Sequence, residues 1–254
     1  MIWKVVLNEW RLLYRSKILQ ALTLGFALIV LLCMLLALQQ HQKQTELYTS
    51  AKDELRAQWE SIDSMNPHSA AHYGTYVFKP TNILSNFDEG IISATGNVLR
   101  VEGHVQNEMV HSEASQMTSV SRFGKFKISL VLQYILPLLL IFLAFNALNS
   151  ERQKGRLKLL VLQGSSPRQL ILSKVLAVWS YSLALLGIVL LLYIGLYFDN
   201  LDADTLLRLG MFALSYMLYY FIIIGLSVLF VAHFKSAMLA LTTNLSCTIT
   251  TPLL

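Results

Sequence analysis

Residues 175–198 read VLAVWSYSLALLGIVLLLYIGLYF, and this stretch decides the fold. It contains no Asp, Glu, Lys, Arg or His, and its 24 residues exceed the length of about 20 that a helix needs to cross roughly 30 Å of hydrocarbon. Three more stretches have the same character: residues 18–38, 128–147 and 209–232. The sequence therefore predicts four transmembrane helices.

The composition of the whole chain agrees with a membrane protein. Of its 254 residues, 55% are hydrophobic and only 14% are charged, and the mean hydropathy is +0.53. A soluble domain usually has about 25% charged residues, so a soluble protein is excluded. A fifth apolar stretch, residues 237–254, is long enough to span a membrane, but the chain stops at its end. We therefore expect an all-α polytopic membrane protein with five apolar spans. For the fifth span, a complete and a truncated helix are both open.

The charges between the spans alternate in sign. Residues 1–17 carry a net charge of +3 and residues 148–174 carry +5, whereas residues 39–127 and residues 199–208 carry −2 each. Because Lys and Arg near span ends stay in the cytoplasm, we expect the N-terminus and residues 148–174 inside the cell. This topology also accounts for the pI near 9.2, and we therefore expect no nucleic-acid partner.

These patterns divide the chain into eight segments. The expected order is a cytoplasmic interfacial helix (1–17), span one (18–38), an extracytoplasmic domain (39–127), span two (128–147), a cytoplasmic loop (148–174), span three (175–198), span four (209–232) and span five (237–254).

The first segment has two faces when its residues are placed at 100° intervals. One narrow stripe holds Lys4, Asn8, Arg11 and Arg15, and the other face is apolar and contains two tryptophans. This pattern predicts a helix that lies along the membrane surface. The alternative is a helical N-terminal extension of the first span.

The extracytoplasmic domain is expected to be mostly helical. Residues 41–63 are rich in Gln, Glu, Lys and Ala and should continue the first span as a helix. Residues 64–100 contain Pro and Gly at intervals, which predicts loops and short elements. From about Val101 to Ser119 we expect a second helix that leads toward span two.

Five of the six histidines lie in this domain, at positions 41, 68, 72, 104 and 111. His68 and His72 are four residues apart, so on a helix they would share a face and could chelate a metal, with Glu102 or His104 as a third ligand. The alternative is that they are structural or interface residues. Asn66-Pro67 and Gly74 leave room for only a short helix, and we assign no metal site from the sequence.

The spans and loops contain no recognisable catalytic chemistry. No apolar span carries a formal charge, which argues against ion-coupled transport. A phosphate-binding loop is missing from the sequence, so any ATP must be bound by another subunit. In span two, Gln133 and Pro137 are four residues apart; we expect a packing kink there, with the lining of a translocation path as the alternative.

The basic loop 148–174 holds the most informative pattern. Ser165 or Ser166 before Pro167 predicts an N-cap followed by proline at the first helical position. The new helix should run directly into span three, so a force on the loop would reach the membrane helices. The alternative is that the basic residues of the loop only set the topology.

The same loop resembles that of the permease subunits of type-2 ABC transporters. The matching residues are Glu151-Arg152-Gln153-Lys154-Gly155-Arg156-Leu157, Leu159-Leu160, Ser166-Pro167-Arg168 and Ser173-Lys174. The segment Glu9–Lys17 is similar to the entry helix of that superfamily. The outer segments Asn66–Gly74, Phe78-Lys79-Pro80 and Glu102–Asn107 look like a bacterial subfamily of unknown substrate.

This resemblance implies a role for the chain and for its partners. The chain would be a transport subunit of the bacterial inner membrane that pairs with a second permease copy or homologue and with a cytoplasmic ABC ATPase. It would bind no cofactor itself, since ATP and Mg²⁺ would sit on the ATPase. Export is expected. Six spans are usual in that superfamily, so a truncated, inactive permease is one alternative, and a non-transporting sensor or docking protein whose histidine-bearing domain binds a metal or partner is another.

The resemblance also implies which residues act. Coupling to the ATPase falls to Glu151, Arg152, Gly155, Leu157, Gly164, Pro167, Arg168 and Lys174. The motif of the outer domain comprises His68, His72, Tyr73, Glu102, His104 and Asn107. Apart from the resemblance, Gln133 and Pro137 stay candidates for a path lining, as the alternative to a packing kink.

Overall fold

The computed structural model describes most of the chain. The residues described are 2–79, 82–88, 90, 92, 98–104, 127–153, 155, 159, 161–164 and 166–234. Within them the chain is mostly helical, and four helices are long and apolar enough to cross a membrane. The expected fifth span at residues 237–254 lies outside the described residues. The chain divides into two compact units, residues 1–31 with 130–254 and residues 32–129.

The first unit begins with two separate helices, α1 (Ile2–Arg15) and α2 (Lys17–Glu60), and α2 runs on into the second unit. Ser16 separates α1 from α2, and its hydroxyl accepts a hydrogen bond from the Leu19 N–H (3.4 Å), as an N-cap serine does. The first segment is therefore a helix of its own, and the alternative of an extension of span one is wrong. The predicted helical continuation beyond span one is confirmed to Glu60.

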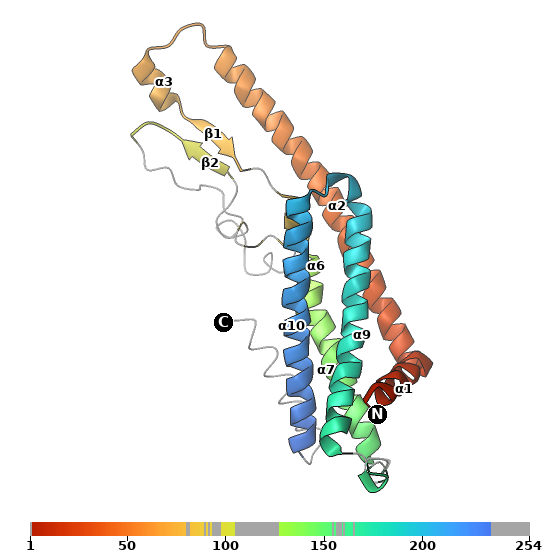
Figure 1. The fold of residues 1–254 in the computed structure, drawn as a ribbon. Coiled ribbons are helices and arrows are strands. Elements are labelled where there is room, and N and C mark those ends of the chain that lie inside the picture. The colour runs from red at the N-terminus through yellow and green to blue at the C-terminus, as the bar shows by residue number, and fades with distance from the viewer. Residues whose placement is uncertain are drawn as a thin grey trace. The chain divides into compact units, whose positions relative to one another are not determined.

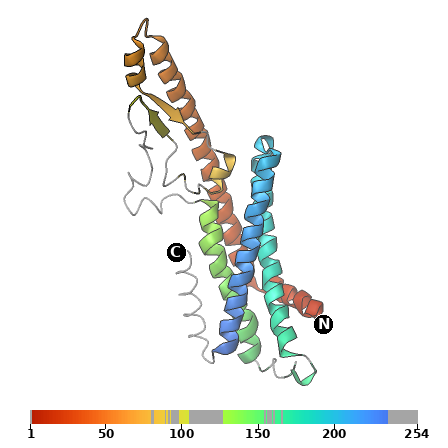
Figure 2. The same cartoon turned by 60° about the vertical axis from the view of Figure 1, so that its left-hand side comes forward.

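The remaining helices of the first unit are α7 (Leu136–Gln153), α9 (Pro167–Leu196) and α10 (Ala203–His233). They lie side by side in both views, and α1 packs against α9 (Figures 1 and 2). A short turn, η4 (Phe198–Asn200), leads from α9 toward α10. The side chain of Asp202 caps α10 by accepting from the Thr205 N–H at 2.9 Å.

One face of α10 is buried in the helix bundle and the opposite face carries large apolar side chains that are exposed. Tyr220, Ile224 and Val228 are fully buried. The exposed residues recur every three or four positions: Leu207, Met211, Leu214, Leu218, Ile222, Leu226 and Leu229. A soluble helix would place polar residues there, so this face is suited to contact with the hydrocarbon of a membrane.

Span two begins irregularly. A single turn, α6 (Ile128–Leu130), is followed by the π-helical turn η3 (Val131–Ile135) and then by α7. Pro137 is buried one residue inside α7 and has no N–H to donate to the carbonyls of the preceding turn. The Tyr220 hydroxyl donates to the Leu132 carbonyl (3.0 Å) and the Tyr219 hydroxyl to the Gln133 carbonyl (3.2 Å). The two tyrosines thus satisfy carbonyls four and five residues before the proline.

The described part of the second unit contains residues 32–60 of α2, the short helix α3 (Pro67–Tyr73), the 3₁₀ turn η1 (Ile83–Asn86) and two strands. The strands β1 (Thr75–Phe78) and β2 (Val98–Val101) pair antiparallel, with Thr75 opposite Val101 and Phe78 opposite Val98. The expected helix from Val101 is wrong at its start, because Val101 ends β2 and residues 103–104 form a turn. The rest of that expected helix lies outside the described residues.

Contacts between aromatic rings hold these elements to α2. Tyr48 on α2 meets Phe78 edge-on at 4.9 Å between ring centroids, and its hydroxyl donates to the Lys79 carbonyl at 3.0 Å. Trp59 meets Tyr73 in the same manner at 5.8 Å. The helix that continues the first span is therefore also the base on which α3 and the strands rest.

The pairing of Tyr220 with the Leu132 carbonyl can be tested by substitution. Tyr220→Phe leaves this buried carbonyl without its donor and should lower the free energy of unfolding by about 1 kcal/mol, a common size for hydrogen bonds between membrane helices. The control is Tyr134→Phe, which alters an exposed tyrosine of span two and should have no effect. Adding Pro137→Ala to Tyr220→Phe should recover part of the loss, because the new N–H can donate to a freed carbonyl. Unfolding in mild detergent measures all three, and no recovery in the double variant would contradict this explanation.

Candidate functional site

A buried ion cluster joins three helices of the first unit. Lys174 lies in the third turn of α9 and is 1% exposed. Its Nζ donates to Oε1 of Glu9 on α1 and to Oε1 of Glu151 on α7, at 2.5 Å in both cases. The exposed fraction of the side chain is 2% for Lys174, 8% for Glu9 and 15% for Glu151, so water hardly reaches the three charges. We name these residues the Glu9–Lys174–Glu151 cluster.

The electrostatics of the cluster are unequal, because one cation faces two acids. Burial raises the pKa of the Glu9 carboxyl, since removing water disfavours its charged form. The nearby Lys174 opposes this shift, and the charge of Glu151 adds to it. Glu9 therefore keeps its proton to a higher pH than an exposed glutamate does.

The neighbour of Glu151 makes a second link. Nη1 of Arg152 donates to the carbonyls of Phe234 (3.0 Å) and Val231 (3.4 Å) at the end of α10. Cations are favoured at that position because the last carbonyls of a helix have no partner within the helix and its dipole is negative there. Two consecutive residues at the end of α7 thus connect it to α1, α9 and α10.

A cavity of about 250 Å³ lies between these elements. Glu151, Arg152 and Lys174 form its polar wall, and the other lining residues are Leu148, Pro167, Leu170, Ile171, Val231 and Ala232. Further contacts tie α1 to α9 beside it: Trp10 Nε1 donates to Ser180 Oγ at 2.8 Å, and the Trp10 ring meets Tyr181 edge-on at 5.7 Å. Tyr181 also hydrogen-bonds to Thr23 on α2.

The described residues of the loop between α7 and α9 are exposed. Gly155 and Gly164 have positive φ angles of 68° and 89°, so both glycines allow turns that other residues would strain. Pro167 occupies the first turn of α9 after Ser166, as predicted, although Ser166 makes no side-chain capping bond. Three apolar side chains of this loop are exposed: Leu159 (59%), Val161 (39%) and Leu162 (83%).

The structure brings only some of the expected coupling residues together. Glu151, Arg152, Pro167 and Lys174 line one cavity, whereas Gly155 and Gly164 lie on the exposed loop and Arg168 is exposed in the first turn of α9. Leu157 lies outside the described residues. In span two, Pro137 is buried and Gln133 is half-buried with its carbonyl engaged by Tyr219, which fits a packing role. A path lining there stays a prediction.

Sequence reasoning missed Glu9 as a site residue. A signal was available, since Glu9 lies about 130° around the helix from the cationic stripe of α1 and beside the buried Val6. An acidic side chain on the apolar face of an amphipathic helix needs a buried cation. The sequence could not say which cation, because Lys174 lies 165 residues later.

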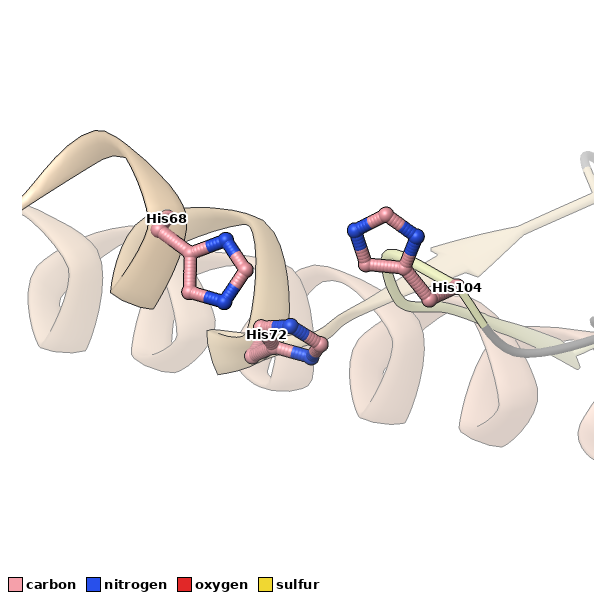
Figure 3. Close-up of side chains that lie close together, drawn as sticks. All are labelled: His68, His72 and His104. Carbon is pink, nitrogen blue, oxygen red and sulfur yellow. The ribbon is translucent and has the colours of Figure 1, made fainter.

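Three histidines of the second unit also converge. His68 and His72 lie on α3, His104 follows β2, and the three side chains face one another (Figure 3). Tyr73 contacts Trp59, and Glu102 forms an ion pair with Arg100 at 3.1 Å. Asn107 lies outside the described residues.

Comparison with known proteins assigns the chain to a family. The family described as ABC-2 family transporter protein matches residues 3–254. The chain belongs to the ABC-2 transporter family. Proteins of the ABC-2 family are membrane subunits that generally work with a separate cytoplasmic ATPase. No curated protein and no solved structure matches the chain significantly.

Loss of the buried cation should destabilise this ABC-2 protein strongly. Lys174→Met leaves two carboxylates in a dry site without a counter-charge, and breaking such a buried pair costs about 3–5 kcal/mol. The matched control is Arg208→Met, because Arg208 pairs with Asp204 on the surface and both side chains are more than half exposed. Exposed pairs of this kind contribute about 0.5 kcal/mol. Equal stability losses in the two variants, measured by thermal unfolding in detergent, would disprove the importance of the cluster.

The raised pKa of Glu9 predicts a pH dependence. The folded protein holds the Glu9 proton at a pH where the unfolded chain has released it, so stability falls as the pH rises from the ordinary glutamate value of 4.5 through the higher folded value. Glu9→Gln removes this titration. The difference in melting temperature between wild type and Glu9→Gln should therefore change across that interval, whereas a constant difference from pH 4 upward would contradict the shift.

Proposed function

We propose that the chain is the permease subunit of an ATP-driven exporter in the bacterial inner membrane. Two copies, or one copy and a homologue, would sit on a pair of cytoplasmic ATPase subunits that bind ATP and Mg²⁺. Family membership supports the permease role. The charge-free spans support an energy source outside this chain, because ion-coupled carriers place ionisable groups within the membrane.

The observation that carries the proposal is the convergence of helix ends at Glu151, Arg152 and Lys174. The loop between α7 and α9 has both of its ends at this point, and α1 and α10 are attached to the same residues. A force on the loop would therefore act on four helices together. Coupling requires an element of this kind, with two arrangements that both sites bias.

The exposed apolar side chains of the loop supply a surface for the ATPase. Leu159, Val161 and Leu162 lie on the segment between two helices, and Leu162 is among the most exposed large side chains described. Because Arg168 is exposed in the first turn of α9, directly after the loop, an apolar contact with a polar rim is the expected form of the interface. The positive net charge of residues 148–174 supports a cytoplasmic position for this surface.

A single charge on this surface should uncouple the subunits. Leu162→Glu places a carboxylate in the apolar contact, and we expect ATPase stimulation to fall about tenfold, which corresponds to about 1.4 kcal/mol. Leu47→Glu is the matched control, because Leu47 is 60% exposed on the outer part of α2 and should leave stimulation unchanged. Both variants are purified with the ATPase partner and reconstituted in nanodiscs. Unchanged complex formation and stimulation in Leu162→Glu would refute the assignment of the coupling surface.

A further inference from the structure

Three histidines of the second unit form a compact group. The nearest ligand nitrogens of His68, His72 and His104 all lie within 4.8 Å of one another. The ring centroids are separated by 4.8 Å for His68 and His72, by 5.3 Å for His72 and His104, and by 6.1 Å for His68 and His104. All three side chains are exposed, so they can rotate toward a shared ligand without disturbing a core (Figure 3).

The first two histidines are positioned by the helix that carries them. The Asn66 side chain caps α3 by accepting from the His68 N–H at 3.0 Å, and Pro67 starts the helix. Residues four apart on a helix lie on the same face, one turn from each other. His68 and His72 therefore point to the same side of α3.

The third histidine is brought in by the strands. Pairing of β1 with β2 returns the chain to the end of α3, where the Gly103 N–H donates to the Ala71 carbonyl at 2.7 Å. A Cβ at Gly103 would lie 3.0 Å from that carbonyl oxygen, an unusually tight contact, so glycine favours this approach. His104 follows with φ at 61°, a left-handed conformation that is uncommon for a residue with a side chain. Two close-packed segments thus hold His104 opposite the helix.

We propose that His68, His72 and His104 bind one divalent transition-metal ion, with Zn²⁺ as the first candidate. Three imidazole nitrogens with a fourth position open to water or another ligand are a common arrangement for Zn²⁺. Ligand nitrogens around tetrahedral Zn²⁺ are about 3.3 Å apart, so rotations of exposed side chains close the remaining gap. An all-nitrogen set disfavours Ca²⁺ and Mg²⁺, which take oxygen ligands.

This site departs from the expectation that the chain binds no metal itself. His104 is the reason, because the sequence placed it in a helix and the structure places it after a strand, facing α3. Of the two third ligands considered from sequence, Glu102 already pairs with Arg100 and His104 completes the set. The site is independent of the proposed transport function, since no residue of the loop between α7 and α9 takes part.

The direct test is a Zn²⁺ titration of the full chain in nanodiscs, purified without a histidine tag. We expect saturable binding of one Zn²⁺ per chain that weakens as the pH falls, because protons compete for the imidazoles. His68→Gln, His72→Gln and His104→Asn should each weaken binding about 100-fold; asparagine is chosen at 104 because it tolerates the left-handed backbone. His41→Gln, in the helical part of the same unit, is the control and should bind as wild type.

Two further measurements guard against misfolded variants. In the wild-type chain, Zn²⁺ should protect His68, His72 and His104, but not His41, from carbethoxylation detected by mass spectrometry. Gly103→Ala keeps every ligand but pushes residues 103–104 away from Ala71, and it should weaken Zn²⁺ binding about tenfold. The proposal is overturned if wild type takes up no stoichiometric Zn²⁺, if the three histidine variants bind like His41→Gln, or if protection is equal at all four histidines.

Discussion

The arrangement of the first unit depends on one buried ammonium group. Lys174 donates to Glu9 and to Glu151 from a position that water hardly reaches, so none of the three charges can be solvated elsewhere while the helices stay packed. Pairs of this type add little net stability, because desolvation offsets most of the attraction. They do specify which helix ends meet. Most of the packed surface in this bundle is apolar, and lipid is as good a partner as leucine, so apolar packing contributes little to this specificity.

The start of span two shows that buried neutral groups also need partners within the protein. Inside a membrane each backbone carbonyl needs a donor from the protein, and Pro137 removes one. Tyr219 and Tyr220 on α10 provide hydroxyls to the carbonyls of the preceding turn, which ties the irregular segment to a neighbouring helix. The irregular helix and the tyrosine pair are therefore one feature. Both this feature and the ion cluster tie span two to neighbouring helices, with polar contacts at its start in η3 and at the end of α7.

Much of this fold could be predicted from local patterns, because hydrocarbon thickness fixes the span length and apolar composition marks the spans. The long helix after span one and the proline at the start of α9 followed from composition and capping rules. The partners of Glu9 and of His104 could not be predicted, because they depend on contacts between distant segments. The short strands were missed because four residues each give little period-two signal, although Thr75–Phe78 is rich in β-formers. Unless the strand pair is predicted, nothing in the neighbouring sequence marks the turn that places His104 opposite α3.

The distance along the chain between Glu9 and Lys174 affects how the protein is made. Glu9 leaves the ribosome 165 residues before its cation does, an interval of roughly 10–30 s at common translation rates. During that time Glu9 has no Lys174 to pair with, because the third span has not been inserted. Docking of α1 must therefore be a late event in biogenesis. α1 is synthesised long before the segment that fixes it, and its docking reports that the third span has been inserted.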